Sequence, residues 1–128
     1  MNLLLDTHIL LWWLNGDKKL PEKIKHLIAQ PENDVYVSHI SLWEMQIKIM
    51  IGRLRADLDA IIKQLPKNDF LELPSRTTHI LTLSRLPMHH QDPFDRLLIA
   101  QAISEPLHFV TCDRQIARYQ DLLLLIDY

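Results

Sequence analysis

The chain contains few cysteines and glycines, the residues that characterise several large classes of protein. It contains a single cysteine, Cys112, in 128 residues, so no internal disulfide can form and a reducing, cytoplasmic setting is expected. That thiol follows an apolar segment, and we interpret it as a packing residue rather than a nucleophile. With only two glycines, the chain has no Gly-rich phosphate loop, which excludes the P-loop and dinucleotide-binding classes.

Long apolar segments and an excess of one charge are also missing. No apolar run approaches the length of about 18 residues that a membrane span needs, and the N-terminus lacks the basic and apolar regions of a secretory signal. The formal net charge is −2 at pH 7. Binding of a polyanion would therefore depend on local basic groups or on a bound metal ion rather than on overall charge.

The composition is that of a soluble globular protein. Hydrophobic residues make up 48% of the chain and charged residues 23%, so a core can form without a disulfide or metal staple. A chain of this length buries roughly two-thirds of the surface that its unfolded form exposes. We expect one domain covering residues 1–128, without repeats or disordered segments.

Short apolar segments alternate with segments of helical periodicity. This alternation predicts βαβ units and an α/β fold, in which helices cover both faces of a central parallel sheet of four to five strands. Two consecutive helices, at residues 41–51 and 58–65, predict a helical hairpin. The expected strands are residues 2–5, 35–37, 70–73, 107–111 and 123–126. The expected helices are residues 7–14, 21–30, 41–51, 58–65, 76–83 and 94–104.

Four acidic residues lie where a predicted strand ends or a predicted helix begins: Asp6, Glu44, Asp95 and Asp113. In a parallel sheet these positions share one edge, because ligands bind outside the carboxyl ends of the strands and the following helices begin there. We therefore expect the four carboxylates, which are far apart in the sequence, to gather in one pocket.

Each acid also has a purely structural interpretation. Asp6 and Asp113 can cap the helical segments that follow them. Glu44 can complete a capping box with Ser41 or pair with the lysine one turn later. Asp95 lies in the first turn of its helix, where a negative charge is favourable. Taken singly, each acid is better explained as part of a helix end than as a ligand.

Taken together, the acids favour a metal site. Two like charges about 4 Å apart repel by about 4 kcal/mol at an effective dielectric constant near 20, whereas a cap contributes about 1 kcal/mol. Close carboxylates must therefore share protons or bind a cation. A ligand set made only of oxygen selects Mg²⁺ or Mn²⁺ over Zn²⁺ or copper, and such ions acidify water and clamp a displacement at phosphorus. The implied chemistry is phosphodiester hydrolysis.

Four motifs resemble the PIN-domain nucleases over nearly the whole chain. They are LLLDTH around Asp6, the S-x-x-E that ends at Glu44, the D-x4-A-x-A that begins at Asp95, and the T-x-D that ends at Asp113. The segment LPMHHQDPFDRLLIAQA, residues 86–102, is the most specific of them. It is similar to a signature of a bacterial and archaeal subgroup that contains VapC-like toxins of type II toxin–antitoxin modules.

The resemblance implies a three-layer α/β/α sandwich and a metal-dependent endoribonuclease, a toxin that forms a homodimer and is silenced by a cognate antitoxin. It also implies that all four acids are catalytic residues and ligands of Mg²⁺ or Mn²⁺. Asp6 and Asp95 are the best direct ligands. Asp113 would help to hold the metal or a water, and Glu44 would act through a water or a second ion. No position of the quartet is missing, which disfavours an inactive member.

Five residues beside the acids are expected to support them. Each has an alternative structural role: helix or turn capping for the two threonines and the aspartate, and a loop hydrogen bond for the histidine. The arginine can pair with a carboxylate or the scissile phosphate, or form a simple structural ion pair. The five are Thr7, Thr111, Asp92, His90 and Arg96.

Two other functions remain open at this point. A metal-dependent phosphatase of another α/β family would also begin with an aspartate at the end of a strand, although it usually has a second aspartate where this chain has His8. A non-catalytic interaction module is the other alternative, because apolar residues surround most of the predicted helix at residues 42–51. That helix would be buried by a subunit, by an antitoxin or by the core.

Overall fold

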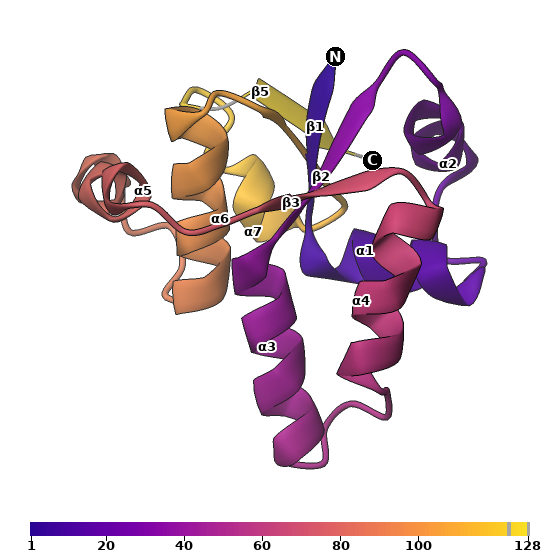
Figure 1. Cartoon of the computed structure of the whole chain (residues 1–128). Helices are drawn as coiled ribbons and strands as arrows, with labels where there is room; N and C mark the ends of the chain where they lie inside the picture. The colour runs from indigo at the N-terminus through magenta and orange to yellow at the C-terminus, as the bar shows by residue number, and fades with distance from the viewer. Residues whose placement is uncertain (123, 128) are drawn as a thin grey trace.

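The computed structural model describes residues 1–122 and 124–127 and contains a five-stranded sheet in which every pair of neighbours is parallel. The strand order is β3-β2-β1-β4-β5, and helices cover both faces, so the predicted α/β/α sandwich is confirmed (Figure 1). The strands are β1 (Asn2–Leu5), β2 (Asp34–Ser38), β3 (Phe70–Leu73), β4 (His108–Thr111) and β5 (Leu124–Asp127).

Alternation along the central strand divides the core into two halves. Leu3 and Leu5 pack into one apolar cluster and Leu4 into the other, because successive side chains of a strand point to opposite faces. A fully apolar central strand is what a parallel sheet covered on both sides requires. The helices of the first cluster include α1 (Thr7–Asn15), α2 (Glu22–Ala29) and α4 (Leu58–Lys67), and those of the second α6 (Pro93–Ser104) and α7 (Arg114–Ala117).

The predicted helical hairpin is formed by α3 (His39–Met50) and α4, and it projects beyond the carboxyl ends of the strands (Figure 1). One face of α3 contributes Leu42 and Met45 to the core. The opposite face is apolar but open, since Trp43 is 56% exposed and Met50 74%. Core packing therefore accounts for only part of the apolar surface of α3.

The start of α3 differs from the sequence expectation. The helix begins at His39 because the hydroxyl of Ser38 accepts the N–H of Ile40 at 2.9 Å and acts as the N-cap. Ser41 therefore lies inside the helix, and the interpretation of Ser41 and Glu44 as a capping box is wrong. Ser38, the last residue of β2, therefore supplies the cap that the sequence pattern assigned to Ser41.

Other boundaries shift by one or two residues. α4 runs through Pro66 to Lys67 instead of ending at residue 65, and the predicted helix at 76–83 is divided into α5 (Thr77–Thr82) and a 3-10 turn, η1 (Leu83–Arg85). Leu123, which the predicted fifth strand included, lies outside the described residues. Among the described helices, none has the length and hydropathy needed to cross a membrane.

The strand order reverses at the β1–β4 pair, since the chain moves outward from β1 through β2 to β3 and then returns on the other side with β4 and β5. Such a reversal opens a crevice at the carboxyl edge of a sheet. Asp6 directly follows β1, Asp113 lies two residues after β4, and Asp95 is in the first turn of α6. Figure 1 shows α3 and α6 beginning at the edge where β1 runs into α1.

Candidate active site

Asp6 is buried between the end of β1 and the start of α1, with 3% of the residue exposed. It occupies the N-cap position of α1, but its side chain makes no capping hydrogen bond. The carboxylate accepts a hydrogen bond from Thr111 Oγ1 at 2.7 Å. The interpretation of this side chain as a helix cap is therefore wrong, and a buried carboxylate oriented by β4 remains.

Glu44 is also buried, and both of its oxygens are held. Thr7 Oγ1 lies 3.0 Å from Oε1 and 2.9 Å from Ser41 Oγ, so two hydroxyls form a short chain that ends on the carboxylate. Lys48 Nζ donates to Oε2 at 2.8 Å. The sequence suggested a surface pair with this lysine, but the carboxylate side of the pair is 5% exposed. The contribution of Ser41 was not predicted.

Asp92 and Asp95 are close together in the sequence but have different roles at the start of α6. Asp92 Oδ1 accepts the N–H groups of Phe94 at 2.9 Å and of Asp95 at 3.0 Å, so Asp92 is the N-cap of α6. The carboxylate of Asp95 accepts no hydrogen bond from the part of the chain that the structure describes, although its side chain is only 17% exposed. The cap is therefore Asp92, whereas Asp95 lies in the first turn of α6 without capping it.

Asp113 keeps a structural role as well as its place at the crevice. Its Oδ1 atom accepts the N–H of Gln115 at 2.8 Å and caps α7. Its own N–H donates to Thr111 Oγ1 at 3.0 Å, and the same hydroxyl donates to Asp6. Thr111 thus links the two acids that follow β1 and β4.

The carboxylates act on one another electrostatically. Burial, assisted by four neighbouring negative charges, raises the pKa of Asp95 to about 8. Those charges belong to Asp6, Asp92, Glu44 and Asp113. Burial also raises the pKa of Asp6, and the charge of Asp113 adds to the increase. The other three predicted acids therefore lie within electrostatic range of Asp95, as their shared edge of the sheet requires.

Lys48 brings one positive charge to this group. Its pKa is raised, first by the hydrogen bond to Glu44 and then by the charges of Glu44, Asp92 and Asp95, against an opposing effect of partial burial. The ammonium group is therefore held in its charged form. Because 39% of its side chain is exposed, it also faces the solvent from which a ligand would come.

The site fits a divalent cation in its chemistry, although its side chains do not form a closed cage. Within residues 1–122 and 124–127, no three His, Cys, Asp or Glu side chains are arranged to hold a metal ion. The available donors are carboxylate oxygens, which Mg²⁺ and Mn²⁺ prefer. Burial, together with neighbouring negative charges, raises the pKa of Asp6 and Asp95, and a bound cation would favour the ionised form of both carboxylates. A hollow of about 230 Å³ at this edge is lined by Asp6, His8, Trp12, Cys112 and Asp113.

The loop before α6 is held by contacts that the sequence did not reveal. Arg96 Nη1 donates to the carbonyl of Pro87 at 2.9 Å and to Tyr119 Oη at 3.1 Å. Its hydrogen bonds with described residues all end on main-chain carbonyls or on this hydroxyl, so Arg96 fastens the loop instead of pairing with a carboxylate. His90 Nδ1 also lies 3.2 Å from Tyr119 Oη. No motif includes Tyr119, and it was missed.

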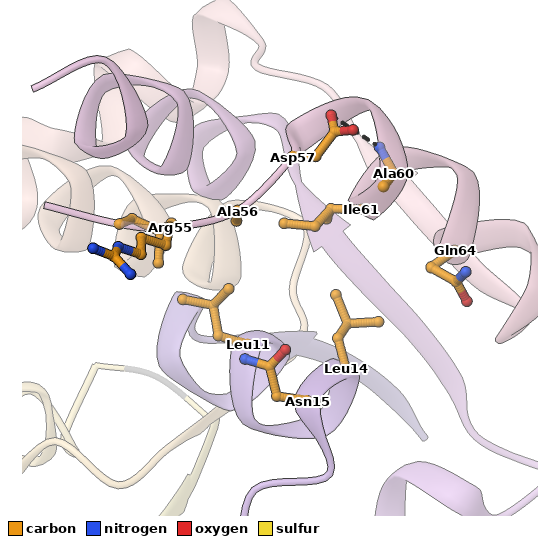
Figure 2. Close-up of a pocket in the computed structure, with 10 residues that line it drawn as sticks. Leu11, Leu14, Asn15, Arg55, Ala56, Asp57, Ala60, Ile61 and Gln64 are labelled. Carbon is orange, nitrogen blue, oxygen red and sulfur yellow. Dashed lines mark hydrogen bonds between the residues drawn. The ribbon is translucent and has the colours of Figure 1, made fainter. Parts of the chain in front are cut away.

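A second hollow, of about 450 Å³, lies on another face of α1, between this helix and α4 (Figure 2). Leu11 and Leu14 of α1 face Ile61 of α4 across it. None of the four acids lines this groove, so it is separate from the acidic crevice. Its polar lining residues are Asn15, Arg55, Asp57 and Gln64.

Comparison with known proteins defines the family. Residues 3–122 match the family model described as the PIN domain, and the chain therefore belongs to the PIN-domain family. PIN-domain toxins are generally nucleases, and PIN-domain nucleases typically use divalent metal ions. Comparison with curated protein sequences gave no match.

Solved structures share the fold over almost the entire chain. VapBC2 from Rickettsia felis, bound to a DNA fragment from its promoter, has a TM-score of 0.74 at 17% identity, and the match covers 99% of this chain and 98% of that chain. VapBC-1 from nontypeable Haemophilus influenzae has a TM-score of 0.71 at 18% identity, with coverages of 99% and 98%. VapBC-5 from Mycobacterium tuberculosis, a member of the VapBC family of toxin–antitoxin systems, has a TM-score of 0.59 at 18% identity, with coverages of 98% and 96%. At these identities the likeness establishes the fold alone.

Proposed function

We propose that this PIN-domain chain is an endoribonuclease that depends on Mg²⁺ or Mn²⁺, with Asp6, Glu44, Asp95 and Asp113 as its catalytic residues and metal ligands. The observation that carries the proposal is the meeting of these acids at one edge of the sheet, where Asp6, Glu44 and Asp113 lie close enough to the Asp95 carboxylate for their charges, together with burial, to raise its pKa to about 8. Gathering like charges in a buried place costs stability, and perturbed carboxyl groups of this kind mark functional sites. A divalent cation explains why the chain retains the arrangement.

Asp6 and Asp95 are the direct metal ligands in this proposal, with Asp113 beside them. When bound, the cation would stabilise negative charge at the scissile phosphate and lower the pKa of the attacking water. Thr111 holds the Asp6 carboxylate at 2.7 Å, which fixes the direction of one ligand in advance. The same hydroxyl anchors the main chain of Asp113. The end of β4 therefore organises two of the four acids.

Glu44 and Lys48 form the part of the site that α3 contributes. Thr7 and Lys48 hold the two oxygens of Glu44, so its carboxylate is fixed in place and can orient a water. Lys48 brings a positive charge to the site, and its side chain is partly exposed to solvent. Its ammonium group can donate to a phosphate oxygen of RNA, which compensates for the negative net charge of the whole chain.

We further propose that the chain is the toxin of a type II toxin–antitoxin pair. The structural relatives are VapBC complexes, one of them described as a toxin–antitoxin system. The groove between α1 and α4 offers an antitoxin segment a docking surface in which Leu11, Leu14 and Ile61 form the apolar part, beside polar lining residues (Figure 2). Occupation of this groove would bury apolar side chains without using any of the four acids.

The proposal also covers the state of the chain in solution. We propose a single domain over residues 1–128 that forms a homodimer in the cytoplasm. Exposed apolar side chains on α3, α4 and the turn between them support self-association, because monomeric proteins rarely expose large apolar patches. These residues are Trp43, Met50, Ile51 and Ile62.

Cleavage of single-stranded RNA by the purified protein tests the activity. We expect internal cuts in the presence of Mg²⁺ or Mn²⁺, none after EDTA is added, and none with Asp6→Asn, whose circular-dichroism spectrum should match that of the wild type. Full activity of Asp6→Asn would discard the site assignment. Growth arrest on expression, relieved by a co-expressed antitoxin, tests the biological role.

The same assays separate the two alternative functions. Turnover of a small phosphomonoester with RNA left intact would identify a phosphatase. Absence of any cleavage dependent on Mg²⁺ or Mn²⁺, together with tight binding of a partner protein, would identify an interaction module.

A further inference from the structure

His90 belongs to a buried polar chain that the proposed catalytic roles do not use. The chain runs from Arg96 through Tyr119 to His90 and ends beside the carboxylate of Asp95. Tyr119 is 1% exposed, and the side chain of His90 is 13% exposed. Buried polar groups normally satisfy one another by hydrogen bonds. The position of each proton along this chain can therefore be deduced from its partners.

The hydroxyl of Tyr119 has three hydrogen-bond partners within the described part of the chain. Arg96 Nη1 donates to it at 3.1 Å, and the N–H of His90 donates at 3.4 Å. Neither group can accept a hydrogen bond, because guanidinium nitrogens and main-chain amides are donors only. The third partner is His90 Nδ1 at 3.2 Å. The hydroxyl proton must therefore point to Nδ1, and that nitrogen is unprotonated.

A neutral imidazole with an accepting Nδ1 carries its proton on Nε2. His90 Nε2 is buried and has no hydrogen-bond partner in residues 1–122 and 124–127. Asp95 Oδ2 lies 3.7 Å away from it. This separation is longer than a hydrogen bond, but a small side-chain rotation would close it. A buried N–H donor is thus directed at a carboxylate that has no other donor among the described residues.

We propose that His90 is a positioning residue for Asp95. Tyr119 and Arg96 hold the imidazole ring in the tautomer that carries hydrogen on Nε2, and this N–H closes onto Oδ2 when the carboxylate serves as a metal ligand. The inference rests on the proposed function, in which Asp95 binds the cation. Hydrogen bonds to the groups that bind a metal typically change metal affinity or activity by about 10- to 100-fold, which sets the expected size of the effect.

Nitrogen NMR of the metal-free chain, labelled with ¹⁵N-histidine, tests the tautomer directly. We expect His90 to be protonated on Nε2 in the wild type, with its signals assigned by their loss in His90→Gln. Tyr119→Phe removes the hydroxyl that donates to Nδ1, so the two tautomers should mix. A wild-type ring protonated on Nδ1 would overturn the proposal whatever the activity of the protein.

Mn²⁺ affinity, measured by calorimetry without RNA, tests the effect on the site. We expect Tyr119→Phe and His90→Leu to weaken binding about tenfold. His90→Gln should retain wild-type affinity, because the glutamine amide nitrogen can take the place of Nε2. His89→Gln is the matched control, since His89 packs edge-on against the ring of Tyr119, with centroids 4.8 Å apart, without contributing to the chain of hydrogen bonds.

The outcomes distinguish this inference from the proposed function. A protein that shows the expected tautomer and the expected losses of Mn²⁺ affinity, yet cuts no RNA, would overturn the ribonuclease activity and support the role of His90. Unchanged Mn²⁺ affinity in both Tyr119→Phe and His90→Leu, in a protein that cleaves RNA, would overturn the role of His90 alone. A wild-type protein that binds no Mn²⁺ would overturn both. If Tyr119→Phe does not fold, the comparison of His90→Leu with His90→Gln decides the question.

Discussion

The two ends of α6 bury polar side chains in opposite ways. Towards the C-terminal end, Gln101 and Glu105 belong to a network that is completely satisfied. His79, which is fully buried, accepts the N–H of Arg76 on Nδ1 at 3.0 Å and pairs with Glu105 through Nε2. Gln101 accepts a hydrogen bond from Ser38, the residue that caps α3. This network fastens α5, α6 and α3 to one another.

At the N-terminal end of α6, Asp95 is nearly as inaccessible but lacks such partners. Four acids are among its neighbours, and its pKa is raised to about 8 by burial and by their charges. The difference shows that burial alone does not decide whether a polar residue stabilises a fold. Complementary partners make the network at Gln101 favourable, whereas like charges make the acidic end costly until a ligand compensates for them.

Asp95→Asn should have the largest effect of any single change at either end. Loss of the charged ligand should lower the rate of RNA cleavage by about a thousandfold or more, while the fold is retained. Single-turnover cleavage in Mg²⁺ or Mn²⁺ measures this effect. Activity close to that of the wild type would remove Asp95 from the site.

Gln101→Leu tests the satisfied end of the helix. It leaves the buried hydroxyl of Ser38 without its acceptor and removes the Gln101 amide from His79 Nδ1, so the free energy of unfolding should fall by about 2 kcal/mol. Urea unfolding measures the loss. Cleavage per folded molecule should be retained, and unchanged stability would show that this network contributes little to the fold.

The pH dependence of stability should distinguish the two ends. Asp95 has an ordinary pKa of 3.8 and a raised value of about 8 in the folded chain, so between these limits the folded state holds one more proton than the unfolded state. The contribution of Asp95 to stability therefore falls as pH rises through this window in the metal-free protein. At about pH 8, Asp95→Asn should be more stable than the wild type by at least about 1.4 kcal/mol, the equivalent of one pKa unit.

Chemical unfolding in EDTA at both ends of that pH window provides the measurement. Metal at saturating concentration should remove the advantage of Asp95→Asn, because the ionised carboxylate is then compensated. An advantage that is independent of pH would point to a cause other than the charge of Asp95.

Asp92→Asn should have the smallest effect, although it lies three residues from Asp95. Asparagine caps a helix about as well as aspartate, so the free energy of unfolding should change by less than about 0.5 kcal/mol. Cleavage should also be retained, because the side chain of Asp92 is engaged by two main-chain N–H groups. Loss of cleavage as severe as in Asp95→Asn would place Asp92 among the catalytic residues.

The shared location of the acids could be predicted because it depends on topology alone. Alternating strands and helices place Asp6, Asp95 and Asp113 at the carboxyl edge of a parallel sheet, whatever the details of packing. The sequence also offered a capping role for each acid. The structure resolves this choice: Asp92 and Asp113 cap helices, whereas Asp6 and Asp95 do not.

The supporting contacts could not be predicted because they join residues that are distant in the chain and have no distinctive spacing. Tyr119 meets His90 from 29 residues away, and Thr111 meets Asp6 from 105 residues away. Ser41 does lie in a recognisable motif, but that motif predicted a helix cap instead of the contact that the structure contains. Its real contact, with the hydroxyl of Thr7, depends on the angle at which α3 leaves the sheet.

Two different parts of the fold supply the charged residues of the acidic crevice. The sheet and α6 position Asp6, Asp95 and Asp113. Glu44 and Lys48 belong to α3, in the hairpin that projects from the sheet (Figure 1). The groove shown in Figure 2 lies where this hairpin meets the rest of the fold, since α1 forms one wall and α4 the other. A molecule bound in this groove would touch α1 and α4 while leaving all four acids accessible to substrate.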